Sequence, residues 1–450
     1  MACRYRSTLA AAAVLAGVLG AWTPTCAQPA DPRMAADVDA AFARMLADPG
    51  NPELTFAYAT AAARAGNLEG AIASLERMLL ADSGLARVRF ELGILYYRIE
   101  SYEAARGYFR TAREGGGLPA DLDARAVEFL AEIDRRQSPH RFSGSVTIGA
   151  RYQSNANSNN NSAFVRIPAI GGLNVTDSGS NRKRDWNALA AVSLLHNYEW
   201  EQGSGDSLET ALTLYGVRQA SVKTVNTTLA EISTGPRLAL PAGPFDSASM
   251  RPYLLAGFVT LDDNRYYHTG GGGLQLQTAF ARAFEWTLGY ETRNTNFRTD
   301  STRSTARDEQ GQGHAVSTSL TWNVTADDSV TAGLALGRTF ARSGYKSSAQ
   351  VETSFSYARR IEAPFGLGAG PWALGTGVAR EIVSYVGGDP NVDRRSRRND
   401  REWRFTVSAS VPVTTDLSFV LIGQHQTVRS SYEVNTYRNE SLTAGLAWGF

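Results

Sequence analysis

The sequence predicts a chain of two domains, α then β, in which a short array of paired helices precedes a 14-stranded antiparallel transmembrane β-barrel. Apolar residues recur at helical spacing up to about residue 136, with an internal repeat of 34 residues. From residue 142 onward they alternate with polar residues, a pattern typical of strands with one apolar face. No run of about 18 apolar residues follows the amino-terminal segment, so a membrane-spanning form of this chain requires a closed barrel.

Residues 1–27 are expected to be a secretory signal. A basic start is followed by an apolar run from Leu9 to Ala21, and Thr25-Cys26-Ala27 offers the small residues that a signal peptidase requires. The mature chain then begins near Gln28. The alternative interpretation is a lipoprotein modified at Cys26, which is disfavoured because the preceding Thr-Pro-Thr is a poor approach to a lipidated cysteine.

The residue types that carry most chemistry are scarce or scattered. Both cysteines, Cys3 and Cys26, lie in the signal, which excludes disulfides and thiolate metal sites from the mature chain. The five histidines show no HExxH motif and no paired spacing, so we expect no metal and no cofactor. No local signature supports a nucleophile with its base, and the chain is not expected to be an enzyme. A net charge of +1 indicates no nucleic-acid partner.

Residues 28–136 are expected to form a tetratricopeptide-like helical domain. Gly66–Ala71 aligns with Glu100–Ala105 at the 34-residue repeat, the second unit (86–119) is the clearer one, and a helix over 118–136 resembles a capping unit. Small residues are needed where paired helices approach closely, and aromatic residues fill the space between them. The residues of the second unit at tetratricopeptide spacing are Leu92, Gly93, Tyr96, Ala105, Phe109 and Ala112.

Stacked helical pairs form a shallow concave surface that is lined by the first helix of each pair. A short array of this kind is more plausible as a docking platform than as a free-standing scaffold. The alternative for two of the lining residues, Phe90 and Ile94, is that they pack against the neighbouring unit. On this register the side chains expected to form a binding groove are Phe56, Arg87, Phe90, Ile94, Tyr97 and Arg98.

Residues 137–141 are the predicted linker and residues 142–450 the predicted barrel. Trp186 and Trp200 fall on the same face near the two ends of one segment, as in the aromatic girdles that flank an apolar band. The strands are expected at 142–152, 185–200, 207–219, 225–240, 251–262, 264–278, 282–293, 311–324, 328–341, 346–360, 371–386, 400–412, 415–429 and 437–450.

The connections alternate in length, as extracellular loops and periplasmic turns do in barrels of the Gram-negative outer membrane. An even strand number puts both ends of the barrel, and therefore the helical domain, in the periplasm. We expect outer-membrane lipids and lipopolysaccharide as partners. Asn155–Asn161 is predicted to be a turn-rich exit from the first strand, and Asp393–Arg398 a solvated or lipopolysaccharide-facing charge run. The long connections are 153–184, 294–310 and 387–399, and the short ones are 201–206, 325–327 and 413–414.

The last strand ends the chain on an aromatic residue, a pattern typical of outer-membrane barrels. One face is apolar and the other is small and mildly polar. We expect this strand to close the barrel and to be the signal that the barrel assembly machinery reads. A soluble edge strand or sandwich is the alternative, disfavoured by the number of similar segments. The residues assigned to closure and assembly are Leu442, Leu446, Trp448 and Phe450.

Four consecutive glycines, Gly270, Gly271, Gly272 and Gly273, interrupt the sixth expected barrel strand. A phosphate-binding loop would require a strand-to-helix turn there, and the period of two continues instead. Glycine within a strand more often marks a bend or weak pairing. The functional hypothesis is a softened wall that bends or opens laterally.

A signal, a small tetratricopeptide domain and a carboxy-terminal barrel together resemble the surface lipoprotein assembly modulator family. The resemblance is clearest where the helical domain meets the barrel. There Tyr102–Phe109 is followed by the capping helix and then by Gly149–Asn157, where the first strand continues into an Asn-rich segment. The resemblance implies a translocator that binds a client lipoprotein, or a related secreted protein, in the periplasm and moves it across the outer membrane. The alternatives are an exopolysaccharide export barrel and a general porin.

Overall fold

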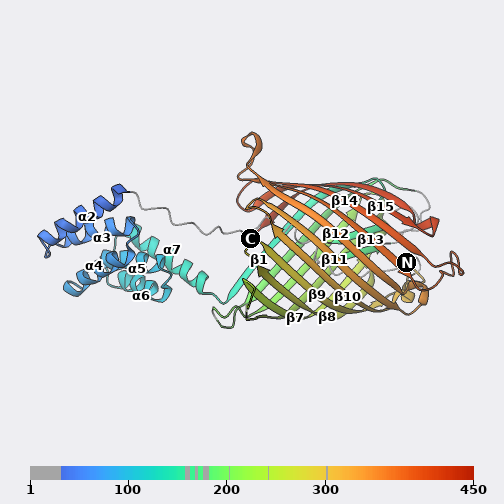
Figure 1. The fold of residues 1–450 in the computed structure, drawn as a ribbon, viewed down its shortest axis with the longest axis horizontal. Coiled ribbons are helices and arrows are strands. Elements are labelled where there is room, and N and C mark those ends of the chain that lie inside the picture. Colours follow the sequence, from blue (N-terminus) through green and yellow to red (C-terminus); the bar gives the residue numbers. More distant parts are fainter. Residues whose placement is uncertain are drawn as a thin grey trace. The chain divides into compact units, whose positions relative to one another are not determined.

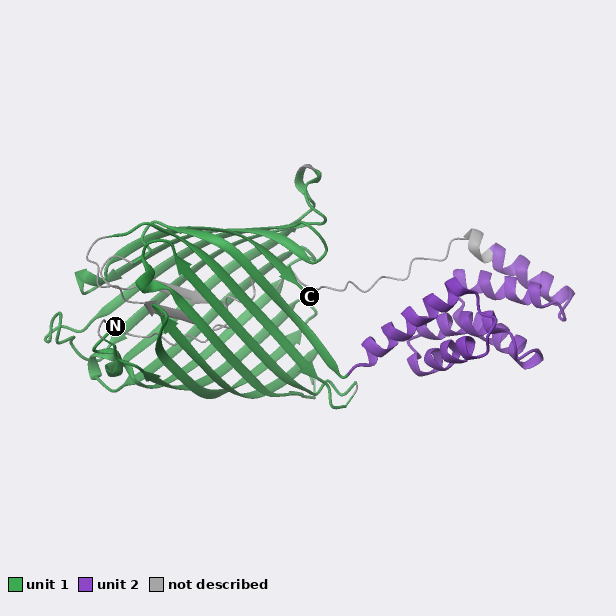
Figure 2. Cartoon of the chain, turned by 180° about the vertical axis from the view of Figure 1, so that it is seen from behind, with its two compact units in different colours: residues 1–20, 139–450 green, residues 21–138 purple. Residues whose placement is uncertain are grey.

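The computed structural model describes residues 32–157, 163–167, 171–175, 182–201, 203–241, 243–300 and 303–450 (Figure 1). The expected signal over 1–27 lies outside the described residues. Two compact units follow each other along the chain, a helical unit that ends at Ser138 and a barrel that begins at Pro139 (Figure 2). The helices and strands therefore segregate into two domains, as the change of hydrophobic period predicts.

The helical unit consists of antiparallel helical pairs with local connections. Asparagine side chains start two of its helices: Asn51 accepts a hydrogen bond from the Glu53 amide at 3.1 Å, and Asn67 accepts one from the Gly70 amide at 3.0 Å. No described helix is long and apolar enough to cross a membrane. The helices are α2 (Pro32–Ala47), α3 (Pro52–Arg64), α4 (Leu68–Ala81), α5 (Ala86–Arg98), α6 (Tyr102–Glu114) and α7 (Ala120–Gln137).

The 34-residue sequence repeat is also a repeat of backbone hydrogen bonds. At the turn between α3 and α4, the Asn67 amide donates to the Ala62 carbonyl at 2.9 Å. At the turn between α5 and α6, the Ser101 amide donates to the Tyr96 carbonyl at the same distance. These bonds lie 34 residues apart, so the two helical pairs turn in the same way, which confirms the tetratricopeptide-type fold of the unit.

Close contact between α5 and α6 depends on the absence of a side chain at Gly93. A Cβ atom added there would lie 2.7 Å from the Phe109 ring, well inside van der Waals contact. Phe109 is fully buried and packs edge to face on Phe90 with ring centroids 5.6 Å apart. The small and the aromatic positions of the repeat therefore fit together as the sequence predicts.

Replacing Gly93 by alanine should destabilise the helical unit by about 1–3 kcal/mol, because the added methyl group overlaps the Phe109 ring. Gly107 on α6 is the matched control, since a Cβ there meets no atom within 4 Å and alanine is the better helix former. Amide hydrogen exchange of α5 and α6 in the full-length protein measures both. Faster exchange in G93A and unchanged or slower exchange in G107A are expected; equal exchange in the two variants would contradict the packing argument.

The two repeat turns place different residues in the same left-handed conformation, Gly66 at φ +87° and Glu100 at φ +61°. A non-glycine residue there costs about 1–2 kcal/mol, because its Cβ crowds the following carbonyl oxygen. We expect E100G to slow amide exchange around its turn and G66A to accelerate it around the other. G66A isolates the conformational cost, since its Cβ meets no atom within 4 Å. If G66A leaves exchange unchanged, the strain assigned to this position is absent.

The barrel is a closed antiparallel sheet of 14 strands in which each strand pairs with its chain neighbours and β1 pairs with β16 (Figure 1). The closing register runs from Ser145 opposite Gly449 to Gln153 opposite Ser441. The strands are β1 (His140–Gln153), β4 (Asp185–Tyr198), β5 (Ser207–Gln219), β6 (Thr227–Ala239), β7 (Ser247–Leu261), β8 (Asn264–Phe280), β9 (Phe284–Phe297), β10 (Gly311–Asn323), β11 (Asp328–Ala341), β12 (Ser348–Ile361), β13 (Trp372–Tyr385), β14 (Asn399–Pro412), β15 (Leu417–Ser430) and β16 (Tyr437–Gly449).

The strand number and order confirm the expected fold class. Some bounds differ from the expectation, since β1 begins at His140, inside the expected linker, and β7 begins at Ser247. Two further features differ. The first connection contains a further hairpin, β2 (Ala163–Ile167) paired with β3 (Gly171–Val175). In addition, β9 continues to Phe297, because two polar residues of its end, Arg293 and Thr295, face the interior of the barrel and are buried there.

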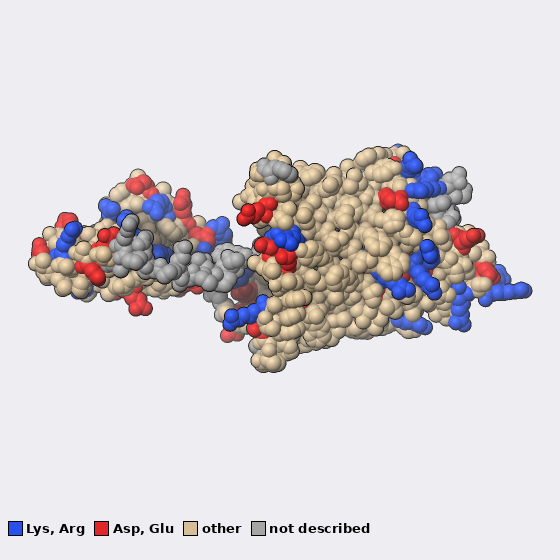
Figure 3. Space-filling view, turned by 45° about the horizontal axis from the view of Figure 1, so that its top comes forward, with Lys and Arg blue, Asp and Glu red and all other residues tan. Residues whose placement is uncertain are grey.

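The two ends of the barrel differ, and we name them by their connections. The loop end carries the connections after β1, β5, β7, β9, β11, β13 and β15, and the turn end carries the others together with both ends of the barrel chain. Large apolar side chains stand outward between them, and Figure 3 shows a broad uncharged band with Lys and Arg gathered toward the loop end. A closed barrel with an apolar outer wall is the form in which strands cross the bacterial outer membrane, and the structure supports that location.

Candidate functional site

The sequence-predicted groove residues lie on α3 and α5 of the helical unit. Phe56 is half-buried on α3, and the exposed Arg87 guanidinium of α5 lies 5.3 Å from its ring centroid. Arg98 is exposed at the end of α5 and donates to the Ala63 carbonyl at 3.1 Å. These three residues join the two helices across one face and present both an aromatic and a cationic surface.

The prediction that Phe90 lines the groove is wrong. Its side chain is completely buried, in a cluster with Ala105, Phe109 and Ile133. The guanidinium of Arg125 on α7 covers its ring at 5.6 Å. Phe90 therefore packs against the neighbouring helical unit, which was the alternative interpretation. That neighbour is α7, which occupies the position of the first helix of a following pair.

Ile94 and Tyr97 are half-buried and belong to the edge of the same cluster. The Tyr97 ring packs on Phe129 of α7 at 5.2 Å and on Tyr102 at 5.7 Å, and Arg136 lies 5.2 Å from its centroid. One side of each residue is thus covered by α7, and the other remains accessible. The capping helix narrows the surface that the sequence predicted to be open.

Two acidic groups of the helical unit sit among aromatic or basic neighbours. Glu76 accepts hydrogen bonds from Tyr96 at 2.7 Å and Tyr108 at 3.3 Å, and the bond to Glu76 raises the pKa of Tyr96 to about 12. Burial raises the pKa of Glu91 on α5, while Arg87 and Arg125 oppose that shift. Glu91 thus interacts with two arginines beside the groove, so this face of the helical unit carries both acidic and basic groups.

The inner wall of the barrel carries ionic networks that join side chains from two or three strands. Glu209 on β5 binds Arg237 at 2.7 Å and Arg251 at 3.0 Å. On the β12–β14 wall, Arg404 pairs with Glu402 and, at 3.2 Å, with Glu352. Period-two alternation predicts that Glu402 and Arg404 share one face, but not which strands supply their partners, because register is a tertiary property.

A third network is centred on Arg293 of β9. Its side chain is 9% exposed and pairs with Glu231 of β6 and, at 2.5 Å, with Glu291 of its own strand. Tyr253 donates to Glu291 at 2.8 Å, and a Cβ on Gly273 would lie 2.6 Å from the Tyr253 ring. The Arg293 guanidinium therefore pairs with two nearly buried carboxylates, and the absence of a side chain at Gly273 leaves space for the Tyr253 ring beside them.

Replacing Arg293 by leucine should lower the free energy of unfolding by about 3–5 kcal/mol, because Glu231 and Glu291 lose their shared counter-ion. The matched control is Arg359→Leu, which breaks a solvent-exposed pair with Asp328 and should change the free energy of unfolding little. The readout is the temperature at which the purified barrel loses its folded mobility in a detergent gel. Adding Glu291→Gln to the first variant should restore part of the loss; equal midpoints for both single variants would refute the role of the network.

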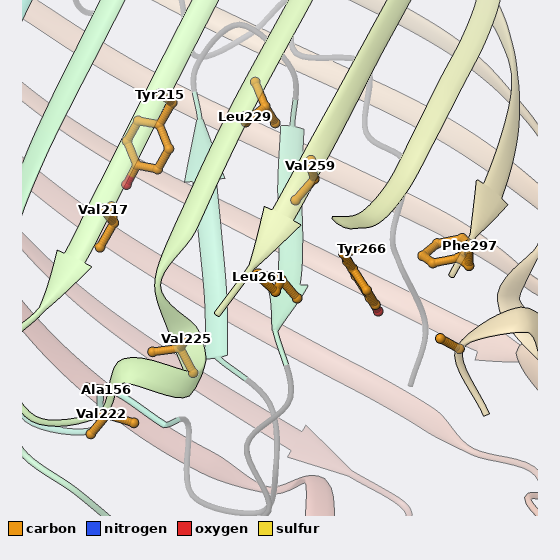
Figure 4. Packing of buried hydrophobic residues seen from close by; sticks show 11 residues of the cluster. Ala156, Tyr215, Val217, Val222, Val225, Leu229, Val259, Leu261, Tyr266 and Phe297 are labelled. Carbon is orange, nitrogen blue, oxygen red and sulfur yellow. The ribbon is translucent and has the colours of Figure 1, made fainter. Parts of the chain in front are cut away.

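The loop end of the inner wall carries an apolar cluster with buried charged groups close to it. Figure 4 shows side chains of β5 to β9 gathered with the short helix η1 (Lys223–Val225). Nearby, Lys346 of η3 (Gly344–Lys346) is almost fully buried and lies 3.4 Å from Glu309, and burial lowers the pKa of Lys346 to about 7. The cluster consists of Ala156, Tyr215, Val217, Val222, Val225, Leu229, Val259, Leu261, Tyr266, Phe297 and Ala306.

The Asn-rich exit from β1 fastens the first strand to the last. The amide nitrogen of Asn155 donates to the Asn439 side chain at 3.0 Å, and the Asn155 side chain donates to the Arg438 carbonyl, also at 3.0 Å. Asn157 is fully buried and accepts from the Lys183 amide at 2.9 Å. The part of this segment after Asn157 lies outside the described residues. Sequence reasoning expected a turn here and missed that its asparagines help to close the barrel.

The outward face of β16 has the composition that the sequence predicts. Leu442, Leu446, Trp448 and Phe450 are each exposed on the outer wall, and the Trp448 and Phe450 rings lie 4.9 Å apart. The last residue also joins the seam, because the Gly144 amide donates to the Phe450 carbonyl at 2.9 Å. Recognition of this strand by the assembly machinery stays a prediction.

The glycine run in β8 is paired on both sides without interruption. Gly270–Gly273 lie opposite Tyr253–Ala256 of β7 and Glu291–Asn294 of β9. A Cβ on Gly271 would lie 2.0 Å from the Thr292 carbonyl oxygen, so close strand approach requires glycine there. Close packing of the strands therefore explains the glycine at position 271. Lateral flexibility of the glycine run stays a prediction.

No cluster of three or more His, Cys, Asp or Glu side chains within the described ranges is placed to hold a metal ion. No family model and no curated protein sequence matches the chain. Among solved structures, a complex of PcrH with the chaperone-binding region of PopD matches at 20% identity and a TM-score of 0.22, over 24% of this chain and 82% of that one.

Solved outer-membrane barrels also match. The channel DcaP of Acinetobacter baumannii matches at 8% identity and a TM-score of 0.38, over 69% of this chain and 97% of that one. A loop-deleted OmpT of Vibrio cholerae matches at 7% identity and a TM-score of 0.36, over 69% and 99%. At these identities no residue role passes from those proteins to this chain.

Proposed function

We propose that this protein is an outer-membrane translocator that captures a client lipoprotein, or a related secreted protein, on its helical unit and passes it through or along its barrel. The observation that carries the proposal is the joining, in one chain, of a tetratricopeptide-type unit with an accessible aromatic and cationic face to a closed barrel. A closed barrel with a charged inner wall fits a transport or channel role more generally.

The accessible face of the helical unit has the chemistry of a peptide-binding surface. We define the client surface as Phe56, Arg87, Ile94, Tyr97 and Arg98, which excludes the buried Phe90. Arginine and aromatic side chains are the residues most enriched at the centres of protein interfaces. Glu91 between Arg87 and Arg125 adds an acidic group, so the surface suits an extended segment with both apolar and charged side chains.

The barrel supplies an interior that a polar chain can occupy. Its ionic networks lie against the wall, and the charges are held in place by partners on the same strand or on strands further around the sheet. Such a wall is also compatible with a plain channel for small solutes, the second candidate function. The two candidates differ in what they require of the helical unit, since only the translocator needs its surface.

The test uses photo-crosslinking in cells that express the full chain. A photoreactive amino acid replaces Phe56 or Arg98 in one set of strains, and Arg77 or Arg110 in the control set. Arg77 and Arg110 are exposed on α4 and α6, the second helices of the repeats. Crosslinked proteins are identified by mass spectrometry, and their surface exposure is then followed by protease shaving.

The expected result is one crosslinked client from the client-surface positions and none from the control positions. In cells carrying R87E/R98E, surface exposure of that client should fall at least about tenfold, because two cationic contacts become repulsive. R77E/R110E introduces the same charge change and should leave exposure unchanged. Equal exposure in wild type and a normally inserted R87E/R98E variant would refute the translocation proposal, and solute flux that depends on the barrel alone would then favour the channel.

A further inference from the structure

Four arginines stand outward on four adjacent strands at the loop end of the barrel. Arg380 lies on β13, Arg401 on β14, Arg429 on β15 and Arg438 on β16, and all four are exposed. We call these four residues the arginine patch. Each shares the outward parity of the apolar side chains on its strand, so the patch belongs to the outer wall and not to the lumen.

The strand registers bring the four side chains together around Trp403. Arg401 is the direct cross-strand partner of Arg429. One row further from the loop end, Arg380 pairs with Trp403, Trp403 with Thr427, and Thr427 with Arg438. The Arg380 guanidinium lies 5.4 Å from the Trp403 ring centroid. Cross-strand neighbours lie about 5 Å apart, so like charges placed directly opposite each other destabilise the sheet unless an anion lies between them.

The patch has no counter-ion among the described side chains. None of its four arginines forms an ion pair in that part of the chain, whereas other outward arginines do: Arg218 pairs with Asp263 at 3.2 Å and Arg359 with Asp328 at 3.7 Å. Glu440, an outward carboxylate on the same strand as Arg438, is already held by Ser154, by Arg182 at 3.2 Å and by His425 at 3.5 Å. Within the described part of the chain, the charge of the patch therefore remains available to a bound anion.

A basic loop is fixed directly above the patch. The connection 386–398 between β13 and β14 exposes Arg394, Arg395 and Arg397, and Tyr432 from the next loop holds it in place. The Tyr432 hydroxyl donates to the carbonyls of Asp393 at 2.9 Å and Ser396 at 2.6 Å, while the Asp389 amide donates to the Tyr432 oxygen at 3.0 Å. The charges of loop and strands thus gather at one place, and Figure 3 shows Lys and Arg concentrated at this end.

Below the patch the same outer wall is apolar. Phe405, Val407, Leu421 and Leu442 continue the outward face of β14 to β16 toward the turn end, and the Trp403 and Phe405 rings stack at 6.1 Å. A ligand that satisfies both regions needs several anionic oxygens at one end and acyl chains at the other. It must also lie at the membrane surface, since the patch sits where the apolar band ends.

We propose that the arginine patch is a binding site for the phosphorylated glucosamine head of lipid A, with its acyl chains lying along the apolar wall of β14 to β16. Guanidinium groups bind phosphate oxygens through paired, charge-assisted hydrogen bonds. Two phosphates on one headgroup match two rows of arginines better than a single phosphate does. The site is independent of what the barrel transports, and it fixes the loop end as the end that faces the outer leaflet.

The experiment measures binding of lipid A to the full-length protein in detergent by native mass spectrometry. The variant R380Q/R401Q/R429Q/R438Q removes the charge of the patch and keeps hydrogen-bonding side chains. The matched control, R218Q/R338Q/R359Q, changes outward exposed arginines elsewhere on the barrel. The probes are diphosphorylated lipid A, monophosphorylated lipid A, phosphatidylglycerol and inorganic phosphate. Folding of each variant is checked by its heat-dependent gel mobility.

The patch variant should bind diphosphorylated lipid A at least about tenfold more weakly than wild type, with the control unchanged. Wild type should prefer the diphosphorylated over the monophosphorylated form, and phosphatidylglycerol and inorganic phosphate should not compete. Equal binding by wild type and a folded patch variant, an equal loss in the control, or effective competition by inorganic phosphate would each overturn the proposal. If the fourfold variant does not fold, R401Q/R429Q replaces it, with an expected loss of at least about threefold.

Discussion

The pairing of β1 with β16 is the constraint on which the rest of the barrel depends. An open sheet would expose the backbone amides and carbonyls of two edge strands to lipid, where no water can satisfy them. Closure removes both edges at once, and it holds over the register from Ser145–Gly449 to Gln153–Ser441. The seam is also secured beyond the ladder, by Phe450 at the turn end and by Asn155 at the loop end. First and last strand must therefore be complete before any lumen or outer wall exists.

Closure places alternate side chains of every strand on the outer wall or in the lumen. The two surfaces therefore carry different types of side chain. Outside, large apolar side chains meet lipid and the remaining charges lie near the ends of the band. Inside, arginines and carboxylates are nearly buried, and the pairs reach across one or more intervening strands: Arg293 of β9 binds Glu231 of β6, and Arg404 of β14 binds Glu352 of β12. A buried charge without its partner is strongly destabilising, which makes these networks part of the wall. The arginine patch differs because it lies outside and forms no ion pair with any side chain that the structure describes.

The helical unit is held by a different kind of constraint, the close approach of paired helices. Gly93 admits the Phe109 ring, and the same turn geometry recurs 34 residues apart. The array is short, and α7 covers Phe90 and one side of Tyr97. Part of the surface that a longer array would expose is therefore buried within the unit. The accessible remainder is Phe56, Arg87, Ile94, Tyr97 and Arg98, the client surface of the proposed function.

The sequence by itself determined the two domains, the barrel strands and the side of each strand that faces lipid. These properties follow from local period, 3.6 in the helices and two in the strands, which any window of the chain displays. The outward face of β16, from Leu442 to Phe450, was predicted in this way. Only the tertiary structure decided which residues meet across strands or helices. The burial of Phe90 under α7, the partners of Arg293 and the gathering of four arginines around Trp403 all depend on register and on helix packing between distant segments, which no local pattern records.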